Sequence, residues 1–456
     1  MSVLLVGNGG REAAIADRLA AEGEAVHVAA QFRNPSLTHA AERSEGQFYQ
    51  VDSITDPRLI AEVAVASRAD LAWVNQDDAL ANGVIDAIRQ HAPAMAVASP
   101  TREGSRIEWD KFYGREIMSE IDYEWDTDYT PRHVLASDAD TAIQAIDYFE
   151  KEGTGVVVKP RGLTGGKLVK VMGPHLRDYA AAVNYALSLI RTSKYGDGVS
   201  IEERLEGHEF TVQALTDGQT LIMPPETYDY PYREAGDKGP GTGGMGDFAF
   251  PEGSNLPFLN DSDRAETQRI MGRVLEKLQE RGQDFKGVLY GSFFKTDRGI
   301  KVVEFNARIG DPEGITMMEL LDTPLIDILH KIARQELEPD DVRFRRMASA
   351  AIYLVSPSYA YPGREGGPYC FEVDQSEVTR HLCNVYFAAA ENIGGDSDSY
   401  HTVGNSRTVA LAANAPTPWE ARGRIIRAIR DGVRGKLEFR NDIADEGYIR
   451  RLAQNR

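Results

Sequence analysis

The start of the chain constrains its fold more than any other segment. Residues 3–6 are apolar and fit a buried strand, a glycine-rich turn follows at residues 7–12, and residues 13–21 are alanine-rich with helical character. A strand, a glycine turn and a helix in direct succession open a doubly wound α/β unit. Further strands fit residues 25–30, 71–75 and 94–98. We therefore predict an amino-terminal α/β domain over residues 1–100.

The glycine turn itself admits two interpretations. Gly7, Gly9 and Gly10 let backbone amides at a helix start approach an anion. Their spacing departs from the dinucleotide-binding fingerprint, because Glu12 occupies the third glycine position. A tight turn that only packs the helix on the strand explains the same residues, so both interpretations stay open.

Length and charge narrow the class of protein. A chain of 456 residues is long for one core, so we expect about two to four domains. The net charge of −19 argues against a general nucleic-acid binder. Cys370 and Cys383 are the only cysteines, which indicates no disulfide framework. The first residues lack a signal-peptide pattern and no window reaches 18 apolar residues. We expect a cytoplasmic protein without membrane contact, as a monomer or a dimer.

A polar glycine loop between two apolar runs marks a second region. Residues 156–160 and 168–172 fit two strands, and the loop Gly162–Lys167 joins them. A glycine-rich flap between antiparallel strands can close over nucleotide phosphates, where Lys159 and Lys167 would add positive charge. Many glycine hairpins do nothing but turn the chain, and that alternative stays open.

The remaining pattern divides the chain further. We predict a second domain over residues 101–335, with the flap-bearing lobe at about 123–200. The acidic linker at residues 336–341 would separate a third domain, 336–456. Helices are expected at 111–120, 266–281, 324–335 and 419–430, and strands at 199–204, 210–215, 220–223, 287–294 and 300–305.

The strand end at residues 302–313 has the strongest chemical signal. Side chains alternate along a strand, so Glu304 and Asn306 point to the same face. Both offer hard oxygen ligands, which Mg²⁺ accepts while water and phosphate fill its other positions. Arg308 follows on the same parity, where a planar cation can brace a transferring phosphate. The segment indicates phosphoryl transfer from a nucleotide, and a strand end with a solvated salt bridge is the plainer alternative.

Two other groups of residues give weaker signals. Glu202 and Glu203 at a strand end, with Glu209 nearby, could meet an adenine and a ribose, although solvated acids explain each of them singly. Asp229 precedes the glycine-dense loop 236–246, which suggests backbone held close to a small polar ligand. A flexible surface loop is the alternative. The histidines show neither paired metal-ligand spacing nor a catalytic triad.

The order of these segments is more specific than any one of them. Together they resemble glycinamide ribonucleotide synthetase (phosphoribosylamine–glycine ligase), an ATP-grasp family of purine biosynthesis. The amino-acid sequence of the motifs is most similar to the archaeal branch of this family. The resemblance covers nearly the whole chain. Thr-Gly-Gly-Met-Gly at 242–246 and Glu-Phe-Asn-Ala-Arg-Ile-Gly-Asp-Pro-Glu at 304–313 are its most specific parts. The other matching motifs lie at 7–12, 156–171, 201–210, 229–241 and 287–294.

The resemblance implies a fold and a reaction. The amino-terminal α/β domain would be followed by a two-lobed ATP-grasp core and a small carboxy-terminal α+β domain. ATP, with Mg²⁺ or Mn²⁺, would lie between antiparallel sheets. Glycine's carboxylate would take the γ-phosphoryl group, and the amine of phosphoribosylamine would attack the acyl phosphate.

The resemblance also assigns roles to single residues. The metal would be bound by Glu304 and Asn306, while Arg308, Lys167 and Asp311 would act at the transferring group. ATP would lie against Lys111, Lys159, Gly165, Gly166, Glu202, Glu203, Leu205 and Glu209. The other substrates would lie against Gly9, Gly10, Arg11, Glu12, Asp229, Gly243, Gly244, Met245, Gly246, Pro312 and Glu313.

Five places depart from the family pattern. The usual histidine of the first turn is Ala13, a usual Gly-Pro-Glu-Ala-Pro-Leu element reads Asn-Gln-Asp-Asp-Ala-Leu at 75–80, and Leu168 follows the flap lysine in place of glycine. Ser292 occupies a position where the archaeal branch often has glutamine, and Gly241 replaces an asparagine that is frequent in the family. A paralogous ligase with another amine acceptor, and a degenerate nucleotide-binding protein, therefore stay open.

Overall fold

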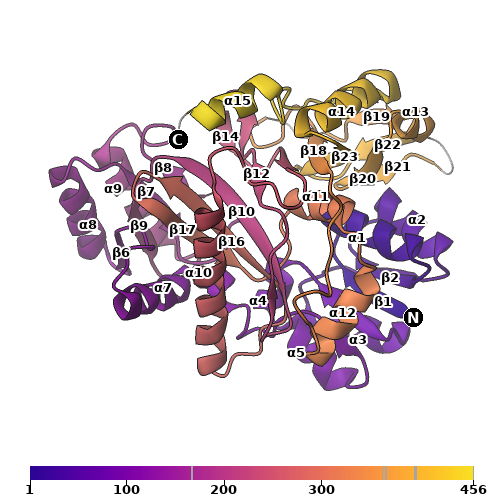
Figure 1. Ribbon diagram of the computed structural model, residues 1–456, viewed down its shortest axis with the longest axis horizontal. Coiled ribbons are helices and arrows are strands. Elements are labelled where there is room, and N and C mark those ends of the chain that lie inside the picture. The colour runs from indigo at the N-terminus through magenta and orange to yellow at the C-terminus, as the bar shows by residue number, and fades with distance from the viewer. Residues whose placement is uncertain (166–167, 362, 365–366, 395–397, 455–456) are drawn as a thin grey trace.

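The computed structural model describes residues 1–165, 168–361, 363–364, 367–394 and 398–454. Figure 1 shows a long central sheet with a lobe bearing α8 and α9 at one end, and the amino-terminal unit and the carboxy-terminal elements at the other. No helix in the described ranges is long and apolar enough to span a membrane. The predicted fold class is confirmed.

The amino-terminal sheet has five parallel strands in the order β3-β2-β1-β4-β5. The strands predicted at 3–6, 25–30 and 71–75 are confirmed, whereas the run at 94–98 yields only a two-residue strand. The elements are β1 (Ser2–Val6), β2 (Ala25–Ala30), β3 (Phe48–Gln50), β4 (Leu71–Val74), β5 (Ala96–Val97), α1 (Gly10–Ala21), α2 (Pro35–Arg43), α3 (Pro57–Ser67), α4 (Asp77–Ala81) and α5 (Val84–His91).

The order of these strands positions a binding crevice. The chain leaves β1 towards β2 on one side and β4 towards β5 on the other, so the direction of winding reverses between β1 and β4. In open α/β sheets, ligands bind at the carboxyl ends of the strands at such a switch point. The glycine turn after β1 and residues 75–77 after β4 both lie there.

A second, smaller lobe has its own core. Its antiparallel sheet has the order β6-β9-β7-β8, and the apolar side chains of this lobe form a cluster separate from the main core. The predicted pairing of the two flap strands is confirmed, although β8 spans only two residues. The elements of the lobe are β6 (His133–Ala136), α8 (Ala139–Lys151), β7 (Val156–Pro160), β8 (Lys170–Val171), α9 (Tyr179–Thr192) and β9 (Val199–Glu203). The preceding helices α6 (Arg106–Trp109) and α7 (Lys111–Trp125) pack into the main core.

The central sheet follows the order β17-β16-β10-β12-β15-β18-β23-β20, and β11 pairs with β10. The predicted antiparallel pairs 287–294 with 300–305 and 210–215 with 220–223 are confirmed. These strands are β10 (His208–Thr216), β11 (Leu221–Ile222), β12 (Thr227–Asp229), β15 (Gly246–Ala249), β16 (Gly287–Thr296), β17 (Gly299–Asn306), β18 (Ala348–Val355), β20 (Asn384–Phe387) and β23 (Arg407–Ala415).

The helix predicted at 266–281 begins earlier than expected. In α10 (Asp261–Glu280) the Asn260 side chain accepts hydrogen bonds from the backbone amides of Ser262 and Asp263. Asp263 in turn accepts one from the Asn260 amide, which completes a capping box. The cap therefore extends the helix beyond the amphipathic pattern that indicated it.

The carboxy-terminal part continues the central sheet, because β18 pairs with β15 across the predicted boundary at 336–341. The domain boundaries therefore stay predictions. A separate small sheet has the order β21-β22-β19-β24. The remaining elements are β13 (Tyr232–Glu234), β14 (Lys238–Gly241), α11 (Glu313–Leu320), α12 (Leu325–Arg334), β19 (Cys370–Val373), α13 (Gln375–Arg380), β21 (Ala390–Asn392), β22 (Ser399–Thr402), α14 (Pro418–Gly432), β24 (Val433–Gly435) and α15 (Glu446–Gln454).

Gly207 lies in the short connection between β9 and β10 and has a φ of +141°. An added Cβ would lie 2.0 Å from the Lys295 carbonyl oxygen on β16, which is backbone and cannot move aside. We expect Gly207→Ala to lower the free energy of unfolding by about 1–3 kcal/mol, measured by urea denaturation. Gly272 in α10 has open space around its Cα, so Gly272→Ala should stabilise by roughly 0.5–1 kcal/mol. Equal effects of the two substitutions would contradict the close approach at Gly207.

Candidate active site

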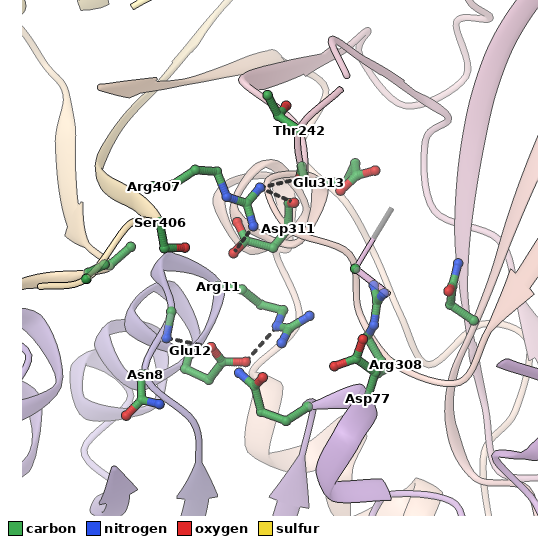
Figure 2. A pocket seen from close by; sticks show the side chains of 18 of the residues that line it. Asn8, Arg11, Glu12, Asp77, Thr242, Arg308, Asp311, Glu313, Ser406 and Arg407 are labelled. Carbon is green, nitrogen blue, oxygen red and sulfur yellow. Dashed lines mark hydrogen bonds and ion pairs between the residues drawn. The ribbon is translucent and has the colours of Figure 1, made fainter. Parts of the chain in front are cut away.

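A cavity of about 530 Å³ opens at the switch point of the amino-terminal sheet, where three parts of the chain meet. Figure 2 shows its walls coming from the amino-terminal unit, the segment after β17 and the carboxy-terminal part. Its lining includes Asn8, Gly9, Arg11, Glu12, Asp77, Gly165, Asp229, Thr242, Gly243, Tyr290, Glu304, Asn306, Arg308, Asp311, Glu313, Asn405, Ser406 and Arg407.

The glycine turn forms one wall and is tied to the segment after β17. The Glu12 carboxylate accepts a hydrogen bond from the Gly9 amide at 2.9 Å and forms an ion pair with Arg11 at 2.6 Å. Arg11 also donates to the Ile309 carbonyl at 2.7 Å. An added Cβ on Gly10 would lie 2.3 Å from the Tyr353 hydroxyl. The turn therefore needs glycine for packing, whatever anion its amides meet.

Asp311 lies at the meeting point of the cavity walls. Its carboxylate accepts from the Tyr353 hydroxyl at 2.6 Å and pairs with Arg407 at 2.9 Å. Arg407 also donates to the carbonyl oxygens of Gly243 and Gly244. The ion pair thus joins β23 to the glycine-dense loop and to the segment after β17.

Two buried carboxyl groups face each other nearby. Burial, together with the charge of Glu313, raises the pKa of Asp229 well above its usual value. Burial also raises the pKa of Glu313, which accepts a hydrogen bond from the Tyr290 hydroxyl at 2.8 Å. The Oδ1 atom of Asp229 is buried without a hydrogen-bond partner. Among the described residues, no donor reaches this oxygen atom of Asp229, so a ligand could supply one.

The predicted metal ligands lie together on the cavity wall, since Glu304 and Asn306 both line it. In the described part of the chain, no three His, Cys, Asp or Glu side chains gather closely enough to hold an ion by themselves. Two oxygen-bearing side chains beside an open cavity suit Mg²⁺ or Mn²⁺, which keep water and phosphate as further ligands. The residues fit a metal that is bound jointly with a nucleotide.

Arg308 is placed beside these ligands by a buried partner. Its guanidinium lies 3.0 Å from the Glu108 carboxylate, which also accepts from the Ala307 amide at 2.8 Å. Burial raises the pKa of Glu108 to about 7, although the charge of Arg308 opposes this. The pair fixes the guanidinium at the cavity wall, opposite Asp77 of the amino-terminal unit (Figure 2).

A narrow recess next to the cavity brings together Lys111, Lys159, Glu202 and Glu304. The Lys159 ammonium pairs with Glu202 at 2.9 Å, and Arg115 contacts both oxygens of the same carboxylate, at 3.0 and 2.6 Å. Burial opposes ionisation of Glu202, but Arg115 and Lys159 hold its pKa well below the usual value. Lys111 donates to the Gly162 carbonyl at 3.3 Å, next to the flap.

The other predicted nucleotide residues are placed differently. Glu203 is buried between Arg132 and Arg298, each at 2.9 Å, so its side chain is already paired. Leu205 follows β9 and is half-buried, while Glu209 is exposed and accepts from Ser292 at 2.7 Å. Gly165 lines the large cavity, and the predictions for Gly166 and Lys167 lie outside the described residues.

The predicted substrate residues divide into two groups. Gly9, Arg11, Glu12, Asp229, Gly243 and Glu313 line the cavity. Met245 is fully buried just before β15, and an added Cβ on Gly246 would lie 2.3 Å from the Ala351 carbonyl oxygen. An added Cβ on Gly244 would likewise lie 2.5 Å from the Cδ of Pro312. These last residues shape the wall behind the cavity, and Gly10 packs against Tyr353.

Several residues at the site were missed from the sequence. Glu108 and Arg115 were not predicted, although with the predicted Lys111 they follow a helical spacing of three and four, which could have indicated one charged face. Arg407 and Tyr353 lie on strands of the carboxy-terminal part, and no local motif marks them. Their role depends on Asp311, which is distant in the sequence and adjacent only in the fold.

Comparisons with known proteins agree with this geometry. The family model described as "Phosphoribosylglycinamide synthetase, N domain" matches residues 1–108, and that of its "ATP-grasp (A) domain" matches residues 110–314. A phosphoribosylamine–glycine ligase of Methanobrevibacter smithii is 33% identical over 456 residues, covering 100% of this chain and 99% of the relative. The chain belongs to the phosphoribosylglycinamide synthetase family.

Other members of this family support the assignment. The phosphoribosylamine–glycine ligase of Methanopyrus kandleri is 34% identical and covers 100% of this chain and 99% of its own length. The crystal structure of the phosphoribosylamine–glycine ligase of Thermotoga maritima has a TM-score of 0.76 and 21% identity, with 97% of this chain and 100% of that chain covered. At that identity it shows the fold alone.

Two adjacent glutamates provide a test of the recess. Glu202→Gln leaves Arg115 and Lys159 buried without a countercharge, which should cost about 3–5 kcal/mol of unfolding free energy. Glu203→Gln frees two arginines whose side chains are 42% and 47% exposed and can be hydrated, so about 1 kcal/mol or less is expected. Urea unfolding measures both. A loss at Glu203 as large as that at Glu202 would contradict the buried cluster.

Proposed function

We propose that this chain catalyses the ATP-dependent ligation of glycine to 5-phosphoribosylamine, giving glycinamide ribonucleotide, ADP and phosphate in purine biosynthesis. The single observation that supports this best is the shared cavity. It joins the predicted metal ligands on β17 to the glycine turn at the switch point, so that a phosphoryl donor and an amine acceptor can meet within it. We expect this ligase in the cytoplasm, where ATP and ribose phosphates are available.

The chemistry matches what the side chains offer. A carboxylate is a poor acyl donor because its leaving group is oxide, and phosphorylation replaces this with phosphate. Positioning and charge neutralisation are then the protein's main contributions. Lys111 and Lys159 would meet the phosphate chain of ATP from the recess, and Arg308 would stabilise charge on the transferred group. When bound at Glu304 and Asn306, Mg²⁺ or Mn²⁺ would neutralise the phosphate oxygens.

We place glycine between the metal ligands and the buried acids. Its carboxylate would face Arg308, and its ammonium group would meet Asp229 and Glu313. The unpartnered Oδ1 of Asp229 supports this, because a buried carboxylate without a donor is costly and an ammonium group would satisfy it. The positive charge would also oppose the burial that raises the pKa of both acids.

The acceptor would occupy the amino-terminal side of the cavity. Backbone amides at the start of α1, together with Asn405 and Ser406, offer donors for a phosphate there. Arg11 and Arg407 add charge but already have acidic partners at 2.6 and 2.9 Å. Water exclusion from the acyl phosphate would then depend on the flap, from which Gly165 reaches the cavity wall.

A ligase with a different amine acceptor is the second candidate, and Ala13 favours it. Ala13 replaces a usual histidine and is fully buried in the core, so it offers no polar group near the glycine turn. Ser292 replaces a frequent glutamine and its hydroxyl donates to Glu209, away from a free metal-facing position. These departures concern the acceptor and the metal more than the phosphate chain of ATP.

A substrate panel separates the candidates. Phosphate release from ATP should require both glycine and phosphoribosylamine, and the gene should restore growth of a purine auxotroph that lacks this ligase. Phosphate release that depends on glycine but not on phosphoribosylamine would favour the second candidate. Tight ATP binding with no turnover on any carboxylate would instead indicate a degenerate nucleotide-binding protein.

Replacing a metal ligand should affect turnover without affecting the fold. Glu304→Gln keeps the size of the side chain but removes its charge, so we expect kcat to fall about 100-fold or more. The Mg²⁺ concentration for half-maximal rate should rise in parallel. Asp297→Asn removes a charge from the exposed turn between β16 and β17 and is the matched control. Undiminished turnover of Glu304→Gln would refute the metal assignment.

A further inference from the structure

The hairpin of β13 and β14 connects segments that line the cavity on either side of it. Asp229 precedes it, and Thr242 and Gly243 follow it. Residues 234–239, at its tip, are exposed, and an added Cβ on Gly236 or Gly241 would meet nothing within 4 Å. Little packing therefore holds the tip, although its two ends determine where the substrate wall lies.

One arginine from the carboxy-terminal segment holds this hairpin. Arg440 is 1% exposed, and its guanidinium donates to the Tyr232 carbonyl at 3.0 Å and to the Asp237 carboxylate at 3.0 Å. It also contacts both oxygens of Asp442, at 2.8 and 2.7 Å, and lies 4.8 Å from the centre of the Tyr230 ring. All its contacts within the hairpin lie between Asp229 and Thr242.

Other contacts of the same segment add to this anchor. Asp442 accepts a hydrogen bond from the Gly236 amide at 2.8 Å, and the Tyr448 hydroxyl donates to Asp237 at 3.0 Å. Here the hairpin supplies the cation as well, because its Arg233 pairs with Glu438 of the carboxy-terminal segment, at 2.6 Å. Figure 1 shows α15, which contains Tyr448, beside β14. The contacts concentrate on a short part of the chain that contributes nothing to the cavity lining itself.

We propose that Arg440 is a positioning residue for the substrate wall, and that it determines the affinity for glycine through the β13–β14 hairpin. A buried guanidinium is costly unless it is paired, so its network adopts one geometry and imposes that geometry on the hairpin. Asp229, at one end of the hairpin, is the residue to which we assign the glycine ammonium group. This inference rests on the proposed function.

The test compares four variants of the full chain in the complete ligase assay. Arg440→Met removes the anchor with similar length, and Arg440→Lys keeps the charge but not the planar fork. Asp237→Asn weakens the anchor from the exposed side, which serves if Arg440→Met does not fold. Arg450→Met is the matched control, because Arg450 lies in α15 and, among the described residues, forms its ion pair with Glu446 on the surface, at 2.6 Å.

We expect Arg440→Met to raise KM for glycine about tenfold, while KM for ATP changes no more than about twofold. Asp237→Asn should shift KM for glycine in the same direction by less, Arg440→Lys should recover part of the loss, and Arg450→Met should match the wild type. Tryptic cleavage after Lys238, followed by mass spectrometry, should be faster in Arg440→Met and Asp237→Asn because the hairpin is released.

The outcomes separate this inference from the proposed function. If wild-type enzyme turns over but Asp237→Asn and a folded Arg440→Met leave both KM for glycine and cleavage after Lys238 unchanged, the inference is overturned. Equal losses of kcat with unchanged KM for all substrates would also overturn it, since that result indicates a purely structural role. A wild-type chain without ligase activity would refute the proposed function, while faster cleavage after Lys238 would still show that Arg440 anchors the hairpin.

Discussion

The buried carboxylate of Glu202 joins the smaller lobe to the rest of the molecule. It lies on β9, its partner Lys159 on β7 and its partner Arg115 on α7. Arg115 also donates to the carbonyls of Val302 and Val303 on β17, at 3.0 and 2.7 Å. One ion cluster therefore fixes the distance between the lobe and the strand of the metal ligands. The lobe has a core of its own, so its position relative to β17 depends strongly on this cluster.

The large cavity has the opposite electrostatic character. More acids than arginines line it, and its arginines are already paired. Arg11 pairs with Glu12, Arg407 with Asp311, and Arg308 with Glu108 behind the wall. Asp229 and Glu313 keep raised pKa values because burial is not compensated there. Such a site favours ligands that bring positive charge. A divalent ion and the ammonium group of an amino acid both meet this condition.

The sequence predicted local elements well and distant contacts poorly. Periodicity and turn residues placed β1, β2, β4 and the hairpins of the central sheet, because each depends on neighbouring residues. The early start of α10 required the cap at Asn260, which hydrophobic patterning does not register. The cavity lining included Glu304, Asn306 and Asp229 as expected. Arg407 could not have been found, since its only signal is an ion pair with a residue 96 positions away.

The domain boundary at 336–341 stays a prediction, and distant strand pairing bears on it too. An acidic linker at 336–341 reads as a division of the chain, yet the backbone pairing of β15 with β18 continues one sheet across it. Strand pairing between distant segments is set by the packing of both faces, which a linear pattern records only in part.

The segment after β17 shows how the three parts of the molecule act on one site. Arg11 of α1 donates to the Ile309 carbonyl, Gln213 of β10 accepts from the Gly310 amide at 2.6 Å, and Arg407 of β23 pairs with Asp311. Three consecutive residues are thus held from the amino-terminal unit, the central sheet and the carboxy-terminal part. Asn306 ends β17 only three residues earlier. In the proposed function, a displacement on the acceptor side would therefore reach the proposed metal ligands through this one short segment, which would link acceptor binding to phosphoryl transfer.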